Sequence, residues 1–101
     1  MLLFELATVS EIGTEIGRRL QAQRLAQNLT QAEVAARAGV SKGTVQNLET
    51  KGQATLESLV KVVMALGLVS ELSGLFVQRA TSIKQLEAAS AGRKRARTSN
   101  K

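Results

Sequence analysis

The chain has 101 residues and a formal net charge of +6, and it contains no cysteine, histidine, tyrosine or proline. This length allows one domain with a modest core, because roughly 60–70% of the unfolded surface is buried at this size. The missing side chains exclude disulfides, thiolate metal sites and common catalytic groups, and the eight carboxylates show no paired or metal-ligand spacing. We therefore expect neither enzymatic activity nor a bound cofactor or metal.

The N-terminus has neither a signal nor an anchor pattern. The apolar stretch Met1–Phe4 is short, and Glu5 follows it directly, whereas a membrane span needs about 20 apolar residues. A chain without cysteine also suits a reducing compartment. We expect a cytoplasmic protein without a membrane partner.

The positive charge is concentrated at the C-terminal end. Residues 91–101 contain five basic side chains and no acidic one, whereas residues 1–90 contain nine basic and eight acidic side chains. The globular part is therefore nearly neutral, so its contacts with a polyanion such as DNA must be local.

Helices should dominate, because alanine, leucine, glutamine, glutamate and arginine are abundant. A capping box formed by Thr8 and Glu11 predicts a first helix that runs to about Gln27, with Asn28 at its end. The apolar stripe expected along this helix consists of Ile12, Ile16 and Leu20.

A second capping box, Thr30 with Glu33, opens a short helix that ends at Gly39. Ser41 caps a third helix that runs to about Thr50. Thr55 caps a fourth helix, which Gly67 terminates, and its expected apolar face consists of Leu56, Leu59, Val60, Val63 and Leu66. Residues 70–76 are expected to form a fifth helix. We divide the chain into an N-terminal segment (1–9), a folded domain (10–78) and a C-terminal extension (79–101).

Residues 31–50, QAEVAARAGVSKGTVQNLET, place small, glycine and branched apolar residues where two crossed helices require them. Ala35 lies where the two helices pass closest, and Gly39 supplies the positive φ of the tight turn. Val34 and Ala35 on one helix and Val45 and Leu48 on the next face inward. The pattern predicts a helix-turn-helix that binds DNA.

The order of the five expected helices resembles the Cro and phage-repressor (XRE) family over about residues 11–76. The second and third of these helices carry the sequence TQAEVAARAGVSKGTVQNLE. The resemblance implies an all-α, five-helix, lambda-repressor-like DNA-binding domain. Within the family the chain is most similar to HipB-like antitoxins, because RRLQAQRLAQNLTQAEVAARAGVS and TLESLVKVVMALGL are followed by a short segment with a basic tail. The Leu-Thr-Gln-Ala-Glu and Gly-Val-Ser stretches also recur across repressors, antitoxins and restriction controllers.

The resemblance implies two structural roles. Arg24 and Glu49 match positions that are ion-paired in related repressors, where a partly buried pair holds two helices in register; the alternative is two solvated charges. Gln31 matches a glutamine that donates to a DNA phosphate in similar repressors, alongside backbone amides, and Ser41 and Thr44 are candidates for similar phosphate contacts.

The third helix presents hydrogen-bonding groups outward once its apolar residues are assigned to the core. Lys42 can donate to guanine, and Asn47 or Gln46 can make the bidentate contact with adenine. Gly43 either lets the backbone approach the groove or packs against a thymine methyl group. The alternative is an ordinary solvated helix face. We take Lys42 and Asn47 as the main base readers, with Gly43 and Gln46 beside them.

The basic tail has three interpretations. Its cationic side chains either contact DNA phosphates from a flexible arm, dock on an acidic partner, or are simply solvated. These residues are Arg93, Lys94, Arg95 and Arg97. Residues 81–89 are expected to form a short helix.

A dimer is expected, because one recognition helix contacts only a few base pairs. The surface for a homodimer is expected at Val69, Leu72, Leu75, Phe76 and Val77, with help from Leu2, Leu3 and Phe4. The alternative role of these side chains is to close the monomer core.

Three functions are compatible with this sequence. The first is a dimeric repressor that acts as a HipB-like antitoxin, restrains a HipA-like kinase toxin and represses its own operon. The second is a free-standing repressor with a palindromic operator. The third is a protein-interaction adaptor that kept the fold without reading DNA.

Overall fold

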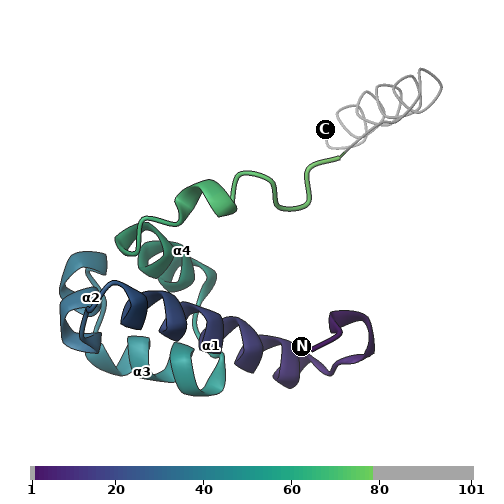
Figure 1. Ribbon diagram of the computed structural model, residues 1–101, viewed down its shortest axis with the longest axis horizontal. Helices are drawn as coiled ribbons and strands as arrows, with labels where there is room; N and C mark the ends of the chain where they lie inside the picture. Colours follow the sequence, from purple (N-terminus) through teal and green to yellow (C-terminus); the bar gives the residue numbers. More distant parts are fainter. Residues whose placement is uncertain (1, 79–101) are drawn as a thin grey trace, which may run out of the picture.

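The computed structural model of this chain describes residues 2–78. This part contains four α-helices and two single-turn 3-10 helices, and no strand occurs within it, so the all-α expectation is confirmed. The elements are η1 (Phe4–Leu6), α1 (Val9–Ala26), α2 (Gln31–Ala38), α3 (Lys42–Lys51), α4 (Leu56–Ala65) and η2 (Val69–Glu71). Figure 1 shows α1 lying along α3, with α2 and α4 gathered near the C-terminal end of α1 and residues 73–78 leading away from the core.

The helix starts follow the predicted caps. Thr8 and Thr30 both form complete capping boxes with the glutamate three residues later, and the Ser41 and Thr55 hydroxyls accept the backbone N–H three residues on. Each cap satisfies a backbone donor that the helix leaves without a partner. The four α-helices therefore begin where the sequence predicts.

The core lies where α2, α3 and α4 meet the C-terminal half of α1. Nine apolar side chains are buried there, and Val45 is completely inaccessible. They are Leu20, Leu29, Val34, Ala35, Val45, Leu48, Val62, Val63 and Leu66. The inward faces predicted for α2 and α3 are confirmed.

The face that α1 turns toward α3 differs from the predicted stripe. Gly13 and Gly17 lie against the backbone of α3 and its C-cap: a Cβ on Gly17 would come within 2.0 Å of the Leu48 carbonyl oxygen. The buried residues of α1 are Gly17, Leu20 and Arg24, while Ile12 and Gly13 are half-buried and Ile16 is 36% exposed. The prediction was wrong for Ile16, because the close approach of two backbones at Gly17 excludes large side chains there.

Two further expectations are corrected near α4. Leu56 is 76% exposed because it occupies the first turn of α4, which projects beyond the core, whereas Val62 is buried in its place. The fifth helix expected over 70–76 is replaced by the 3-10 turn η2 and a series of turns. Leu68, at the N-cap of η2, offers no side-chain acceptor, and the Ser73 hydroxyl instead donates to the Ser70 carbonyl.

No helix among residues 2–78 is both long and apolar enough to cross a lipid bilayer. The predicted helix over 81–89 and the basic residues of the tail lie outside the described residues.

Candidate nucleic-acid interface

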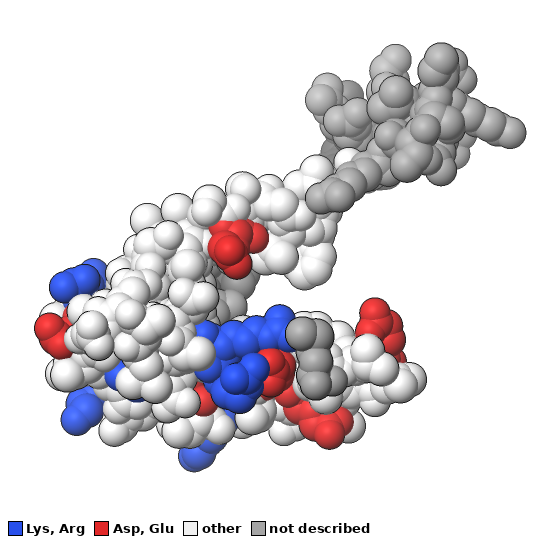
Figure 2. All heavy atoms as spheres, viewed as in Figure 1, with Lys and Arg blue, Asp and Glu red and all other residues white. Residues whose placement is uncertain are grey.

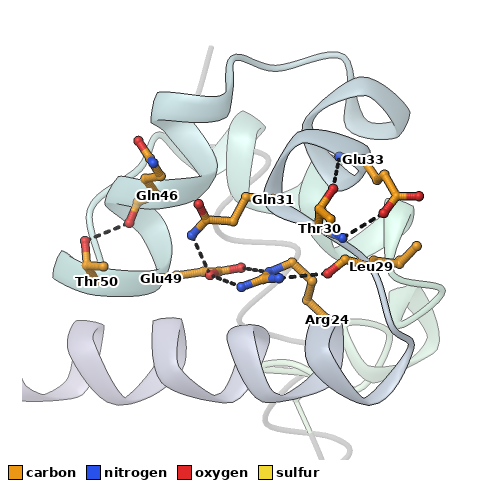
Figure 3. Close-up of polar contacts among 8 residues, drawn as sticks. All are labelled: Arg24, Leu29, Thr30, Gln31, Glu33, Gln46, Glu49 and Thr50. Carbon is orange, nitrogen blue, oxygen red and sulfur yellow. Dashed lines mark hydrogen bonds and ion pairs between the residues drawn. The ribbon is translucent and has the colours of Figure 1, made fainter.

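The outer face of α3 is open. Val45, Leu48 and Glu49 turn one side of the helix into the core, which leaves Lys42, Gly43, Gln46 and Asn47 exposed on the other side. Among residues 2–78, no hydrogen bond engages the side chains of Lys42, Gln46 or Asn47. The Gln46 carbonyl accepts the Thr50 hydroxyl at 2.7 Å, while the Gln46 side chain points away from the protein (Figure 3). The four predicted base-reading positions thus share one accessible surface.

The folded part of the chain is electrically balanced, with seven basic and seven acidic residues up to residue 78. Figure 2 shows blue and red side chains interspersed over one face. Ion pairs within the described part engage Arg18 and Arg19 with Glu15, Arg24 with Glu49, and Lys61 with Glu57. The basic side chains outside these pairs are Arg37, Lys42 and Lys51.

All three of those cations belong to the helix-turn-helix unit. Arg37 lies in the last turn of α2, Lys42 opens α3 and Lys51 closes it. A neutral domain attracts a polyanion only through such local groups, so the charge pattern favours α2 and α3 as the contact surface.

Arg24 and Glu49 form a buried pair with two-point geometry. The Arg24 Nε donates to Glu49 Oε2 at 2.7 Å, and Nη2 donates to Oε1 at 3.0 Å. Nη1 also donates to the Leu29 carbonyl at 2.7 Å. Both side chains are under 10% exposed, so they are not solvated charges. The hydrogen bonds to Glu49 raise the pKa of Arg24, which keeps the guanidinium charged despite its burial.

Gln31 joins this pair from the start of α2. Its Nε2 donates to Glu49 Oε1 at 3.0 Å, so one carboxylate connects α1, α2 and α3 (Figure 3). The Gln31 amide is therefore held by the protein, and its second N–H is the group left for a phosphate. The sequence does not predict the bond between Gln31 and Glu49, because 18 residues separate the two positions and no local pattern relates them.

An open depression of about 510 Å³ lies beside the N-terminus of α2. Thr30, Gln31 and Ala32 line one side of it, and Arg24 and Lys42 also contribute to its wall. The first N–H groups of a helix lack intrahelical partners and attract anions. This depression combines such a helix start with Lys42, a cation outside the ion pairs, which suits a phosphate group.

The Ser41 and Thr44 hydroxyls are less free than predicted for phosphate contacts. Ser41 Oγ accepts the Thr44 backbone N–H at 3.0 Å, and the two hydroxyls share a hydrogen bond of 2.9 Å. Ser41 thus serves first as the cap of α3.

The residues expected at a dimer interface fall into two groups. Leu72 packs against the core. Val69, Leu75 and Val77 are at least half exposed, and Phe76 is 97% exposed with a φ of +54°. Near the N-terminus, Leu3 is exposed, while the Phe4 ring lies 5.0 Å from the Arg19 guanidinium. Within the segment 69–77, Leu72 therefore helps to close the core, whereas the other four apolar side chains named here face solvent.

Residues 20–72, more than half of the chain, match the family described as Helix-turn-helix (HTH_3). The chain belongs to this family. It is an XRE-type helix-turn-helix protein, and the family is typically a non-enzymatic DNA-binding domain, which supports a DNA-binding transcriptional regulator. The match covers α2, α3 and α4 together with the part of α1 that carries Arg24. The search of curated proteins found no match.

Proposed function

We propose that this helix-turn-helix protein is a sequence-specific, DNA-binding repressor in which α3 enters the major groove. The observation that carries the proposal is the open outer face of α3, where Lys42, Gln46 and Asn47 are exposed while the opposite face of the helix is buried. Lysine suits guanine, and the two amides suit adenine. Gly43 lies among them.

The phosphate backbone is proposed to lie across the depression at the start of α2. Gln31 donates its free N–H there, and Lys42 also lines the depression. Such contacts set the position of the protein on the duplex without selecting a sequence. The tail residues Arg93, Lys94, Arg95 and Arg97 are proposed to add affinity for phosphates of any sequence.

The experiment is a selection of bound duplexes from a random library, followed by gel shifts at rising salt. Asn47→Ala should relax the base preference at one or two positions, whereas Gln31→Ala should weaken binding to all sequences alike. Lys42→Ala should lower the affinity for the selected duplex, and Lys61→Ala on α4 is its matched control.

Unchanged affinity in both Asn47→Ala and Gln31→Ala would favour the protein-interaction adaptor instead. Because Gln31→Ala also removes the bond to Glu49, its thermal midpoint is measured in parallel. An altered affinity with an unaltered midpoint assigns the effect to the DNA contact.

The active form is proposed to be a homodimer with two recognition helices, which matches half-sites about 34–36 Å apart. The exposed apolar residues of the segment 69–77 supply the surface for this dimer. Sedimentation of Phe76→Asp should show a monomer, and a variant that sediments like the parent would place the interface elsewhere.

The resemblance to HipB-like proteins further suggests an antitoxin that restrains a HipA-like kinase and represses its own operon. Co-purification with the product of a neighbouring kinase-like gene tests this role. A gene that stands alone in its operon favours the free-standing repressor.

A further inference from the structure

Gly43 is a glycine that the fold itself does not require. Of the seven glycines in residues 2–78, Gly39, Gly52 and Gly67 have positive φ, and Gly13 and Gly17 lie against the backbone of α3 or its C-cap. Gly43 and Gly74 have neither property, and of these two only Gly43 lies in an α-helix. It lies in the first turn of α3 with helical backbone angles, and a Cβ added to it would meet only the Ser41 Oγ, at 3.8 Å.

An alanine would therefore fit the folded protein at this position without strain. Replacing glycine by alanine at a compatible site normally stabilises a protein, because the unfolded chain loses conformational freedom. The glycine is thus less favourable than alanine for this fold. No contact within the described residues uses the missing side chain at Gly43, whereas a partner that approaches α3 from solvent could use it.

Gly43 also occupies the middle of the proposed base-reading face. Gln46 and Asn47 follow it by three and four residues, so they are its neighbours on the same side of the helix. All three are exposed. A partner that reaches these two amides also meets the bare backbone at Gly43.

We infer that Gly43 determines specificity by absence of a side chain: its Cα lies directly against the major-groove edge of a base pair, in a space that has no room for a Cβ. This inference rests on the proposed DNA binding of α3. The Cα methylene has no hydrogen-bonding group, so the base edge that suits it best is the apolar C5-methyl of thymine. The close approach in turn lets the two amides reach their bases.

The test compares Gly43→Ala with the parent full-length protein on two probes, a duplex that the parent selected from a random library and an unselected duplex. Gly43→Ala should bind the selected duplex about tenfold or more weakly. It should bind the unselected duplex like the parent, and its thermal midpoint should rise by a few degrees. A weaker complex from a more stable protein is an outcome that a structural role for Gly43 does not produce.

Met64→Ala is the control, because Met64 is an exposed, uncharged side chain on α4, outside both α3 and the segment 69–77. It should leave both affinities unchanged. Parent-like binding of the selected duplex by Gly43→Ala would overturn this inference while leaving the proposed function intact. A lowered thermal midpoint in Gly43→Ala would also overturn it. A parent protein that selects no duplex would overturn the proposed function itself.

Discussion

At the scale of single residues, one buried carboxylate connects the elements of the proposed interface. Glu49 accepts hydrogen bonds from Arg24 and Gln31, and these three residues come from α3, α1 and α2. No buried side-chain nitrogen or oxygen lacks a partner in the described part of the chain. A fully satisfied network of this kind rigidifies the surrounding core, so it holds α3 in place relative to the start of α2.

Removing one member of the pair should cost more than removing both. Arg24→Met leaves Glu49 buried without its cation and should lower the free energy of unfolding by about 3–5 kcal/mol. The double variant Arg24→Met with Glu49→Leu should recover most of that loss, since apolar replacements of a buried pair are often neutral. Denaturant titrations of the three proteins measure the difference. Equal losses in the single and double variants would contradict this account.

At the scale of elements, the contact between α1 and α3 depends on glycine. Gly17 lies under the Leu48 carbonyl, and Gly13 faces Gly52 across the same junction. Side-chain packing normally separates two helix axes by 8–10 Å, and small residues permit a closer approach. Backbone contact between α1 and α3 therefore sets the distance between these two helices.

Gly17→Ala should destabilise the domain, because the added Cβ would lie 2.0 Å from the Leu48 oxygen and would force the helices apart. Overpacking of this kind costs typically 1–3 kcal/mol. Thermal unfolding measures the change, with Gly74→Ala as the control that meets no neighbour. An unchanged thermal midpoint for Gly17→Ala would contradict this prediction, because it would mean that α1 and α3 move apart at little energetic cost.

The charged groups on the helices also make stability depend on pH. Hydrogen bonds from Arg18 and Arg19 lower the pKa of Glu15 from 4.5 to about 2, and the Thr30 backbone N–H lowers the pKa of Glu33. A carboxyl whose folded pKa is depressed stabilises the protein above its unfolded pKa, and that contribution is lost as protons bind. Stability should therefore be level above about pH 5 and should fall as the pH decreases from 4.5 toward 2.

The measurement is the thermal midpoint against pH for the parent and Glu15→Gln. The variant should show a shallower acid limb, and added salt should reduce the difference, because both arginines are exposed. Superimposable profiles would indicate that Glu15 does not contribute to acid unfolding.

At the scale of the whole molecule, the net positive charge and the proposed base-reading residues lie in different parts of the chain. The part up to residue 78 is neutral, so the net charge of +6 comes from residues 79–101. Affinity for DNA of any sequence depends mainly on cationic groups that displace counterions from phosphates. We expect the domain to choose the sequence and the tail to supply much of the salt-dependent affinity.

Replacing Arg93, Lys94, Arg95 and Arg97 by glutamine tests this division. Each phosphate contact that is lost should reduce the slope of log affinity against log salt by about 0.9. The base preference and the thermal midpoint should stay unchanged. An unaltered salt slope would instead direct the tail to an acidic protein partner.

Much of this protein is determined locally. Each cap joins residues three apart, and Gly39 closes α2 through its own backbone angle, so the starts of all four α-helices and the helix-turn-helix could be predicted from short stretches. The four positions on the outer face of α3 follow from the period of its buried residues in the same way.

Contacts between segments far apart in the sequence decided the rest. Two stripes of α1 share the helical period, and only the position of α3 decides that Gly13 and Gly17 meet its backbone and that Ile16 is left exposed. The bond from Gln31 to Glu49 likewise exists only because α2 and α3 cross. Local patterns specify which residues share a face, but the neighbour that covers a face is specified by packing, because burial depends on the shape of both surfaces.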